Sequence, residues 1–122
     1  MYRDLKPENV LISNQGHIKL VDFNLSKKLD SSKTYTLCGT PHYLAPEVIT
    51  RAGYGINADI WSLGVLIFEF WTGKTPFDAK NPQDIFRNIL KLKINWQGTL
   101  DGRTRLLIKK LLTPDPSLRP TI

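Results

Sequence analysis

The N-terminal loop of this 122-residue chain combines side chains that could do phosphoryl chemistry. Asp4, Lys6 and Asn9 place a carboxylate, an amine and an amide close together, and a second carboxylate, Asp22, follows the apolar run 18–21. Asn9 and Asp22 offer hard oxygen ligands, which Mg²⁺ accepts when phosphate oxygens and water complete its shell. Asp4 could then accept a proton from an attacking hydroxyl, and Lys6 could balance the charge of a phosphoryl group. From spacing alone, a capped loop with solvated acids remains the favoured alternative.

Two short apolar runs are expected to position these groups. Residues 10–12 and 18–21 read as strands, and the turn residues Asn14, Gln15 and Gly16 lie between them. This pattern predicts a small hairpin. A hairpin brings the Asp4 to Asn9 loop and Asp22 to the same end.

A longer apolar run, NADIWSLGVLIFEFWTG at 57–73, predicts the central element of the fold. Its apolar residues fall on every face of a helix, so we expect a helix at about 58–72 that is buried on all sides. Gly73 should end it. The run is shorter than the roughly 20 apolar residues that span a bilayer. The apolar residues are Ile60, Trp61, Leu63, Val65, Leu66, Ile67, Phe68, Phe70 and Trp71.

Three further helices are expected. A short one begins at Pro46 and continues to Thr50, and a second runs at about 82–93 with Asn81 as N-cap and Pro82 as first residue. Its predicted inner stripe is Ile85, Ile89, Leu90 and Leu92. The third lies at about 104–112, with Leu106, Leu107, Ile108, Leu111 and Leu112 as its apolar residues, before Pro114 and Pro116 stop it.

The composition excludes several classes of function. The formal net charge is +6, but the basic residues read as scattered, with one loose cluster at Lys27, Lys28 and Lys33, so we expect no nucleic-acid partner. Lys91, Lys93 and Arg87 read as the solvated face of a helix. A single cysteine rules out an internal disulfide and fits a reducing compartment. Without a signal peptide or membrane-spanning run, we expect no membrane partner and a cytoplasmic location, with the nucleus as a second one.

Several motifs in a fixed order favour the phosphoryl-chemistry interpretation of the N-terminal loop over a capped loop with solvated acids. YRDLKPEN, VDFN, GTPHYLAPE and DIWSLG together resemble the C-terminal lobe of a eukaryotic serine/threonine protein kinase. Tyr2 and the run TLCGTP resemble the AGC group, which contains the cyclic-nucleotide-dependent kinases. The resemblance covers essentially all 122 residues. It implies an α+β fold, mainly α, with a short β-hairpin at the catalytic loop (2–9), an activation segment (22–47) and a central buried helix.

The resemblance also assigns roles to the polar residues. It implies that Asp4 is the catalytic base, that Lys6 contacts phosphate, and that Thr40 bonds both of them. Asn9 joins the catalytic set and, with Asp22, would bind Mg²⁺. The residues implied to face ATP are Lys6, Glu8, Asn9 and Asp22.

The activation segment carries a possible modification site. Thr36 matches the phosphorylated threonine of the AGC group, and Arg3 and Lys27 match the basic residues that receive its phosphate. An ordinary exposed hydroxyl is the open alternative. Three nearby hydroxyl residues compete with it: Ser31, Ser32 and Thr34.

Substrate recognition is implied at two places. Glu8 and Glu69 match acids that hold a substrate arginine, which predicts a basic-directed enzyme. His42 replaces a glutamate that is common in the group. An apolar residue next to the phosphorylated one would enter a pocket formed by Leu37, Pro41 and Leu44.

Two further matches are structural. Glu47 resembles a glutamate that pairs with a distant arginine, here Arg119. Asp59 resembles the acid that accepts backbone N–H bonds from the catalytic loop, although helix capping alone also favours an acid there. One position departs from the family: the DFG motif reads Asp22-Phe23-Asn24. Asn tolerates left-handed backbone angles best among non-glycine residues, but its side chain sits beside the metal site.

The expected function follows from the resemblance. We expect a kinase that uses ATP and Mg²⁺, acts on protein substrates and has a regulatory subunit or domain as a further partner. The 122 residues read as a partial kinase domain without the N-terminal lobe and last helix, and they should be inactive alone because the Gly-rich loop and its lysine are missing. The alternative is a pseudokinase-like or truncated piece that binds partners through apolar surface around the central helix.

Overall fold

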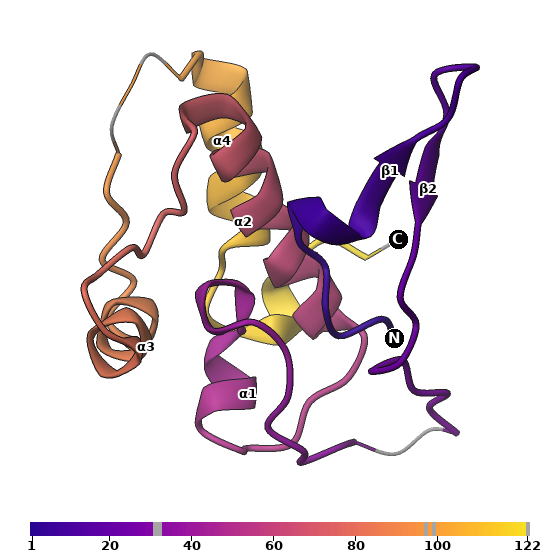
Figure 1. The fold of residues 1–122 in the computed structure, drawn as a ribbon. Coiled ribbons are helices and arrows are strands. Elements are labelled where there is room, and N and C mark those ends of the chain that lie inside the picture. The colour runs from indigo at the N-terminus through magenta and orange to yellow at the C-terminus, as the bar shows by residue number, and fades with distance from the viewer. Residues whose placement is uncertain (31–32, 97, 99, 122) are drawn as a thin grey trace.

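The structure is a computed structural model that describes residues 1–30, 33–96, 98 and 100–121. Within those residues the fold consists of four α-helices, short 3-10 turns and one two-stranded antiparallel sheet (Figure 1). The expected α+β class, mainly α, is therefore confirmed. Within the same residues, no helix is both long and apolar enough to cross a membrane.

The predicted hairpin is present and stands apart from the helices (Figure 1). Strands β1 (Val10–Ile12) and β2 (Ile18–Leu20) pair with Val10 opposite Leu20. Gly16 adopts a left-handed φ of 81° in the turn, which glycine does without strain. Because no helix covers the sheet, four apolar side chains stay exposed: Leu11, Ile12, Ile18 and Leu20.

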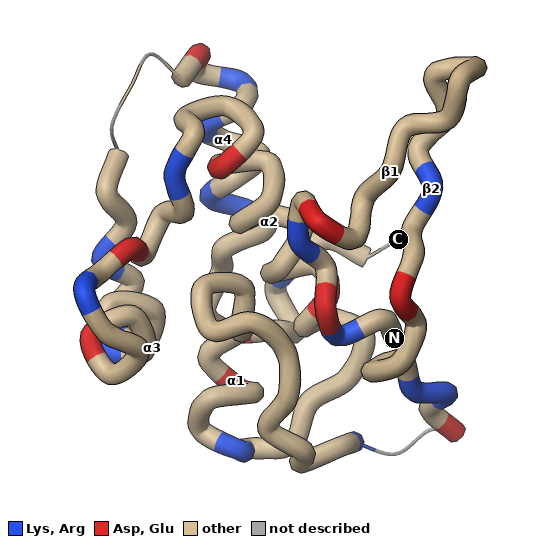
Figure 2. The backbone as a smooth tube through the Cα atoms, viewed as in Figure 1, with Lys and Arg blue, Asp and Glu red and all other residues tan. Residues whose placement is uncertain are grey.

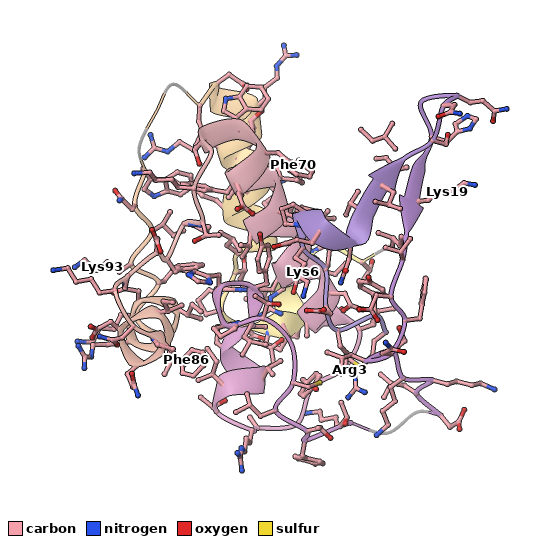
Figure 3. The ribbon with its side chains drawn as sticks, viewed as in Figure 1. Arg3, Lys6, Lys19, Phe70, Phe86 and Lys93 are labelled. Carbon is pink, nitrogen blue, oxygen red and sulfur yellow. The ribbon has the colours of Figure 1, made fainter. Side chains whose placement is uncertain are left out.

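Helix α2 (Asn57–Thr72) is the centre of the core. Trp61, Val65 and Phe68 are at most 1% exposed, and Gly73 ends the helix as expected with a φ of 76°. The expectation of burial on all sides is wrong at the last turn, where Phe70 and Trp71 are 63% and 54% exposed. Phe70 projects from α2 toward the side where the hairpin stands (Figure 3).

Helix α4 (Gly102–Leu111) packs directly on α2. A Cβ on Gly64 would lie 2.8 Å from Leu111 Cβ and 2.9 Å from Leu112 Cδ2, so only glycine allows the two helices to come this close. The helix starts two residues before the expected position because Asp101 accepts hydrogen bonds from the N–H groups of residues 103 and 104. Of the apolar residues expected in this helix, Ile108, Leu111 and Leu112 are buried, whereas Leu106 and Leu107 are exposed.

Helices α1 (Pro46–Ile49) and α3 (Pro82–Leu90) complete the body. The side chain of Asn81 caps α3 by accepting the N–H of Asp84 at 2.9 Å, as the sequence predicts. The helix ends earlier than position 93, and Leu92 adopts a left-handed φ of 49°. Leu90 and Leu92 are therefore exposed, and the predicted inner stripe holds only for Ile85 and Ile89.

Candidate active site

Asp4 lies at the centre of a polar network that joins the loop at 2–9 to the segment at 22–47. Lys6 Nζ lies 2.8 Å from Asp4 Oδ2 and donates to Thr40 Oγ1 at 3.2 Å, while Thr40 Oγ1 donates to Asp4 Oδ1 at 3.0 Å. Asn9 Nδ2 donates to the main-chain and side-chain oxygens of Asp4 at 2.9 and 3.1 Å. The predicted contacts of Thr40 with Asp4 and Lys6 are present, and the bonds from Asn9 to Asp4 add to them. Figure 3 places Lys6 between the hairpin and α1.

The network keeps Asp4 ionised. Burial alone would raise the pKa of this carboxyl group, but the hydrogen bonds from Lys6, Thr40 and Asn9 and the charge of Lys6 outweigh burial and lower it. The Asp4 hydrogen bond and charge in turn raise the pKa of Lys6, together with the more distant charges of Glu8 and Asp22. At neutral pH the site therefore holds an acceptor and a cation side by side.

Asp59 in the first turn of α2 holds the loop that carries Asp4. Its carboxylate accepts the backbone N–H of Tyr2 at 2.7 Å and that of Arg3 at 2.9 Å, which is the contact expected from the sequence. Arg3 has a left-handed φ of 74°, which is costly for a non-glycine residue and needs support from its surroundings. A Cβ on Gly39 would lie 2.8 Å from the carbonyl oxygen of Arg3, so the chain at Gly39 packs tightly over the same bend.

The possible metal ligands come together at the base of the hairpin. The N–H of Val21 donates to the carbonyl of Asn9 at 3.1 Å, so Asp22 follows directly beside the Asn9 loop. Burial first, and then the charges of Asp4 and Asp22, raise the pKa of the Tyr2 phenol. No group of three or more His, Cys, Asp and Glu side chains among the described residues could hold a metal. One carboxylate and one amide oxygen fit Mg²⁺ only where phosphate oxygens and water supply the other ligands.

Asn24 does not adopt the left-handed conformation considered for it. Among the described non-glycine residues, positive φ values occur at Arg3, Asp22, Arg51 and Leu92, so the turn is made by Asp22 itself at φ 59°. The Asn24 N–H donates to Asp22 Oδ1 at 3.2 Å. The two residues form a local side-chain turn, which is a common role for Asp. Phe23 packs edge-on against Tyr2 with the ring centres 5.2 Å apart.

Thr36 is exposed, as a modification site requires. Its carbonyl accepts the Tyr54 hydroxyl at 2.6 Å, which fixes its backbone. Lys27, expected to receive a phosphate at Thr36, instead donates to Thr34 Oγ1 at 3.2 Å. Thr34 is buried and forms a backbone bridge with Tyr54, so it is not an accessible competitor. The other competitors, Ser31 and Ser32, lie outside the described residues.

Glu8 and Glu69, the predicted arginine ligands, line one hollow of about 330 Å³. Asp78 also lines it, and His42 Nε2 lies 3.5 Å from Asp78 Oδ1. The Tyr43 hydroxyl donates to Glu69 Oε2 and orients that carboxylate. Burial, the hydrogen bond to Glu69 and its charge raise the pKa of Tyr43. Lys74 is the lysine of its lining, so three acids outnumber it and the hollow suits a basic side chain.

The apolar pocket expected from Leu37, Pro41 and Leu44 stays a prediction. Leu44 is buried in the core, whereas Leu37 is 41% exposed on the surface. Pro41 begins the short 3-10 helix η2 (Pro41–Tyr43) and is partly exposed.

The expected pair between Glu47 and Arg119 is present and deeply buried. Arg119 Nη1 donates to Glu47 Oε1 at 2.6 Å, and Nη2 donates to Oε2 at 2.8 Å. This two-pronged geometry is the strongest form of an arginine–carboxylate contact. It joins α1 to the segment after α4.

Sequence reasoning missed the two tyrosines that hold site residues in place. Tyr43 orients Glu69, and Tyr54 fixes Thr36. Both partners are distant in sequence, so no spacing rule connects them. The only signal was the burial expected of aromatic residues near the APE motif.

Comparisons with known proteins match all or nearly all of the chain. The protein kinase domain family matches residues 1–122. A cAMP-dependent protein kinase catalytic subunit PRKX from Mus musculus is 53% identical over 98% of this chain and 33% of its own length. The cAMP-dependent protein kinase catalytic subunit 3 of Drosophila melanogaster is 49% identical over 98% of this chain and 20% of its own length. The cAMP-dependent protein kinase catalytic subunit of Schizosaccharomyces pombe is 46% identical over 98% of this chain and 23% of its own length. The chain thus spans a third or less of these curated relatives.

Proposed function

This chain belongs to the protein kinase domain family, and from that premise we propose that it supplies the catalytic loop and substrate-binding side of an ATP-dependent serine/threonine kinase. One observation carries the proposal: Asp4, Lys6, Thr40 and Asn9 form a single bonded network beside the hairpin end that bears Asp22. The relatives named as cAMP-dependent protein kinase catalytic subunits support it.

Each residue of the network has a defined task. Asp4, kept ionised by its neighbours, accepts the proton of the substrate hydroxyl as that oxygen attacks phosphorus. Lys6 balances the charge of the transferred phosphoryl group, and Thr40 and Asn9 hold the Asp4 carboxylate in position. Asn9 and Asp22 would hold Mg²⁺, which neutralises charge on the phosphates of ATP. Glu8 lies on the ATP side of the loop and also contributes to the acidic hollow.

The preferred substrates are protein segments with an arginine near the target serine or threonine. The acidic hollow formed by Glu8 and Glu69 supports this preference, because a guanidinium pairs well with two carboxylates. Leu37, Pro41 and Leu44 are proposed to receive the residue after the target. Phosphate on Thr36, received by Arg3 and Lys27, would order the activation segment. A regulatory subunit or domain is a proposed further partner, and the proposed location is the cytoplasm, with the nucleus as a second one.

Magnesium-dependent ATP binding tests the site directly. In calorimetry on the 122-residue chain, we expect Asp22→Asn to weaken Mg–ATP binding by about tenfold or more, because one of two protein ligands loses its charge. The matched control is Asp84→Asn, which removes the same charge from a partly exposed acid on α3. Equal binding by wild type and Asp22→Asn would contradict the proposed metal site.

Phosphoryl transfer to an arginine-containing serine peptide tests the activity. We expect none from the 122 residues alone, since the relatives are three or more times longer and the printed sequence has no Gly-rich phosphate loop. Transfer that disappears in Asp4→Asn would contradict the expected inactivity while supporting the kinase chemistry.

A non-catalytic, pseudokinase-like partner-binding role is the second candidate. An open hollow of about 400 Å³ next to α2, lined largely by apolar side chains such as Leu5, Ile60 and Leu63, favours it. Failure of a folded chain to bind Mg–ATP under any condition would favour this role over the first.

A further inference from the structure

The positive charge of the chain is concentrated in one stretch. Between positions 91 and 110 there are six basic residues and a single acid, Asp101, so this stretch carries most of the net charge of +6. The expectation of scattered basic residues is therefore wrong for the C-terminal part. Blue segments recur along α4 and the connection that precedes it (Figure 2). The six are Lys91, Lys93, Arg103, Arg105, Lys109 and Lys110.

A hollow lies at the centre of this basic stretch, which we call the α4 hollow. Its volume is about 310 Å³, and Lys109 and Thr113 line it together with five apolar residues. Leu92, left outside the core by the early end of α3, is 37% exposed there. The apolar residues are Leu92, Ile94, Trp96, Leu112 and Pro114.

Trp96 forms a fixed wall of the α4 hollow with two cations over its ring. Arg105 Cζ lies 4.6 Å from the ring centre and Lys109 Nζ lies 5.9 Å from it. Phe68 packs edge-on against the same indole at 5.7 Å and holds it in place. The attraction between a cation and an aromatic face keeps both charges beside the hollow.

Among the described residues, no salt bridge joins either of these two cations to an acid. Arg105 and Lys109 are four residues apart on α4, where like charges repel. Lys93 extends from the neighbouring connection into solvent (Figure 3). An apolar hollow bordered by unpaired cations is complementary to an apolar group that carries negative charge beside it.

We propose that the α4 hollow binds a protein segment in which an apolar side chain is flanked by carboxylates. The apolar side chain enters between Leu92, Trp96 and Leu112, and the carboxylates pair with Lys109 and Arg105, the two cations beside the Trp96 ring. A second copy of this chain is disfavoured because two such faces would bring like charges together. A nucleic-acid base is disfavoured because Arg105 already covers a face of Trp96. The proposal does not depend on phosphoryl transfer.

Fluorescence anisotropy with defined peptides tests the docking site. The probe is a short labelled peptide with two leucines flanked by glutamates, and two companion peptides replace the glutamates by lysines or the leucines by serines. We expect the 122-residue chain to bind the first peptide and neither companion. Lys109→Glu should weaken binding by about tenfold or more, because it converts an attraction at the hollow into a repulsion.

Lys28→Glu is the matched control, because Lys28 is an exposed lysine of the activation segment and the charge change is identical. We expect it to weaken binding by less than about twofold. If Lys109→Glu and Lys28→Glu weaken peptide binding equally, the proposal is overturned in favour of non-specific charge attraction. Binding of the companion peptide with serines in place of leucines would show that no apolar side chain is required, which would also overturn it. Tighter binding of a single-stranded oligonucleotide, or a dimer in light scattering that Lys109→Glu dissociates, would also overturn it.

Discussion

Two carboxylate–cation pairs of this chain have nearly the same chemistry and opposite surroundings. Asp4 and Lys6 approach to 2.8 Å with side chains that are 10% and 24% exposed. Glu47 and Arg119 approach to 2.6 Å with side chains that are 8% and 0% exposed. The first pair stands beside open space at the hairpin base, whereas the second is enclosed by α1, α2 and the chain after α4.

The two pairs differ in how many hydrogen bonds each cation already makes to other groups of the chain. Beyond Glu47, the Arg119 guanidinium donates to three backbone carbonyls at 2.7 to 3.0 Å and lies 5.1 Å from the centre of the Trp61 ring. Lys6 donates to Asp4 and Thr40 and keeps exposed surface. A saturated pair can only hold the fold together, while a pair with spare hydrogen-bonding capacity can also meet a substrate. The three accepting carbonyls belong to Thr113, Asn57 and Pro114.

Removing the buried cation should have the largest effect. Arg119→Met leaves Glu47 charged and unpaired in the interior, so we expect the free energy of unfolding to fall by about 3 to 5 kcal/mol. Urea unfolding followed by circular dichroism measures this. Replacing both partners, with Glu47→Leu added, should recover a large part of the loss. If Arg119→Met lowers the free energy of unfolding by less than about 1 kcal/mol, the pair does not hold α1 to the segment after α4.

Asp59→Asn should have an intermediate effect. An amide offers one acceptor oxygen where the carboxylate offers two, so either Tyr2 or Arg3 loses its backbone hydrogen bond. We expect a loss of about 1 to 3 kcal/mol. Hydrogen exchange at the Tyr2 and Arg3 amides should become faster while the amides of α2 keep their protection. Uniform acceleration along α2 would contradict a local anchoring role.

Asp4→Asn should have the smallest effect on stability and a distinct pH dependence. We expect a change of about 1 kcal/mol or less at neutral pH, since this pair is partly exposed. Folding lowers the pKa of Asp4 below its ordinary value of 3.8. Its stabilising contribution is therefore present above that value and is lost as the pH falls through the folded-state pKa.

Urea unfolding of wild type and Asp4→Asn from neutral to acid pH measures that dependence. The difference between the two proteins should be constant near neutrality and should disappear in acid. A difference that grows as the pH falls would contradict a lowered pKa for Asp4.

The contacts that the sequence predicted best are those tied to motif positions or to capping chemistry. The family pattern placed Asp59 against the Tyr2–Arg3 backbone and Glu47 against Arg119, although each pair is far apart in the chain. The N-cap of α3 at Asn81 and the end of α2 at Gly73 were predicted from local sequence preferences. Spacing alone would have found the caps and not the long-range pairs.

The exposure of apolar side chains was predicted less well. Periodicity indicates which residues share a face of a helix, but it does not indicate whether another element covers that face. Phe70, Trp71 and Leu106 belong to apolar runs of helices and are nevertheless more than half exposed. The left-handed backbone at Asp22, rather than Asn24, depends on a turn closed by the side chain of Asp22 itself. The basic α4 hollow was missed because its wall forms only where α3 ends early.

The exposed hairpin determines how this chain behaves at high concentration. Its two strands have unpaired outer edges and four exposed apolar side chains, and such edges can extend from one molecule to the next as a shared sheet. That association requires no unfolding of the helices. We therefore expect colloidal solubility to depend on the hairpin more than on thermodynamic stability, so that a lysine on the outer face of the hairpin reduces precipitation more than a substitution that strengthens the helical core.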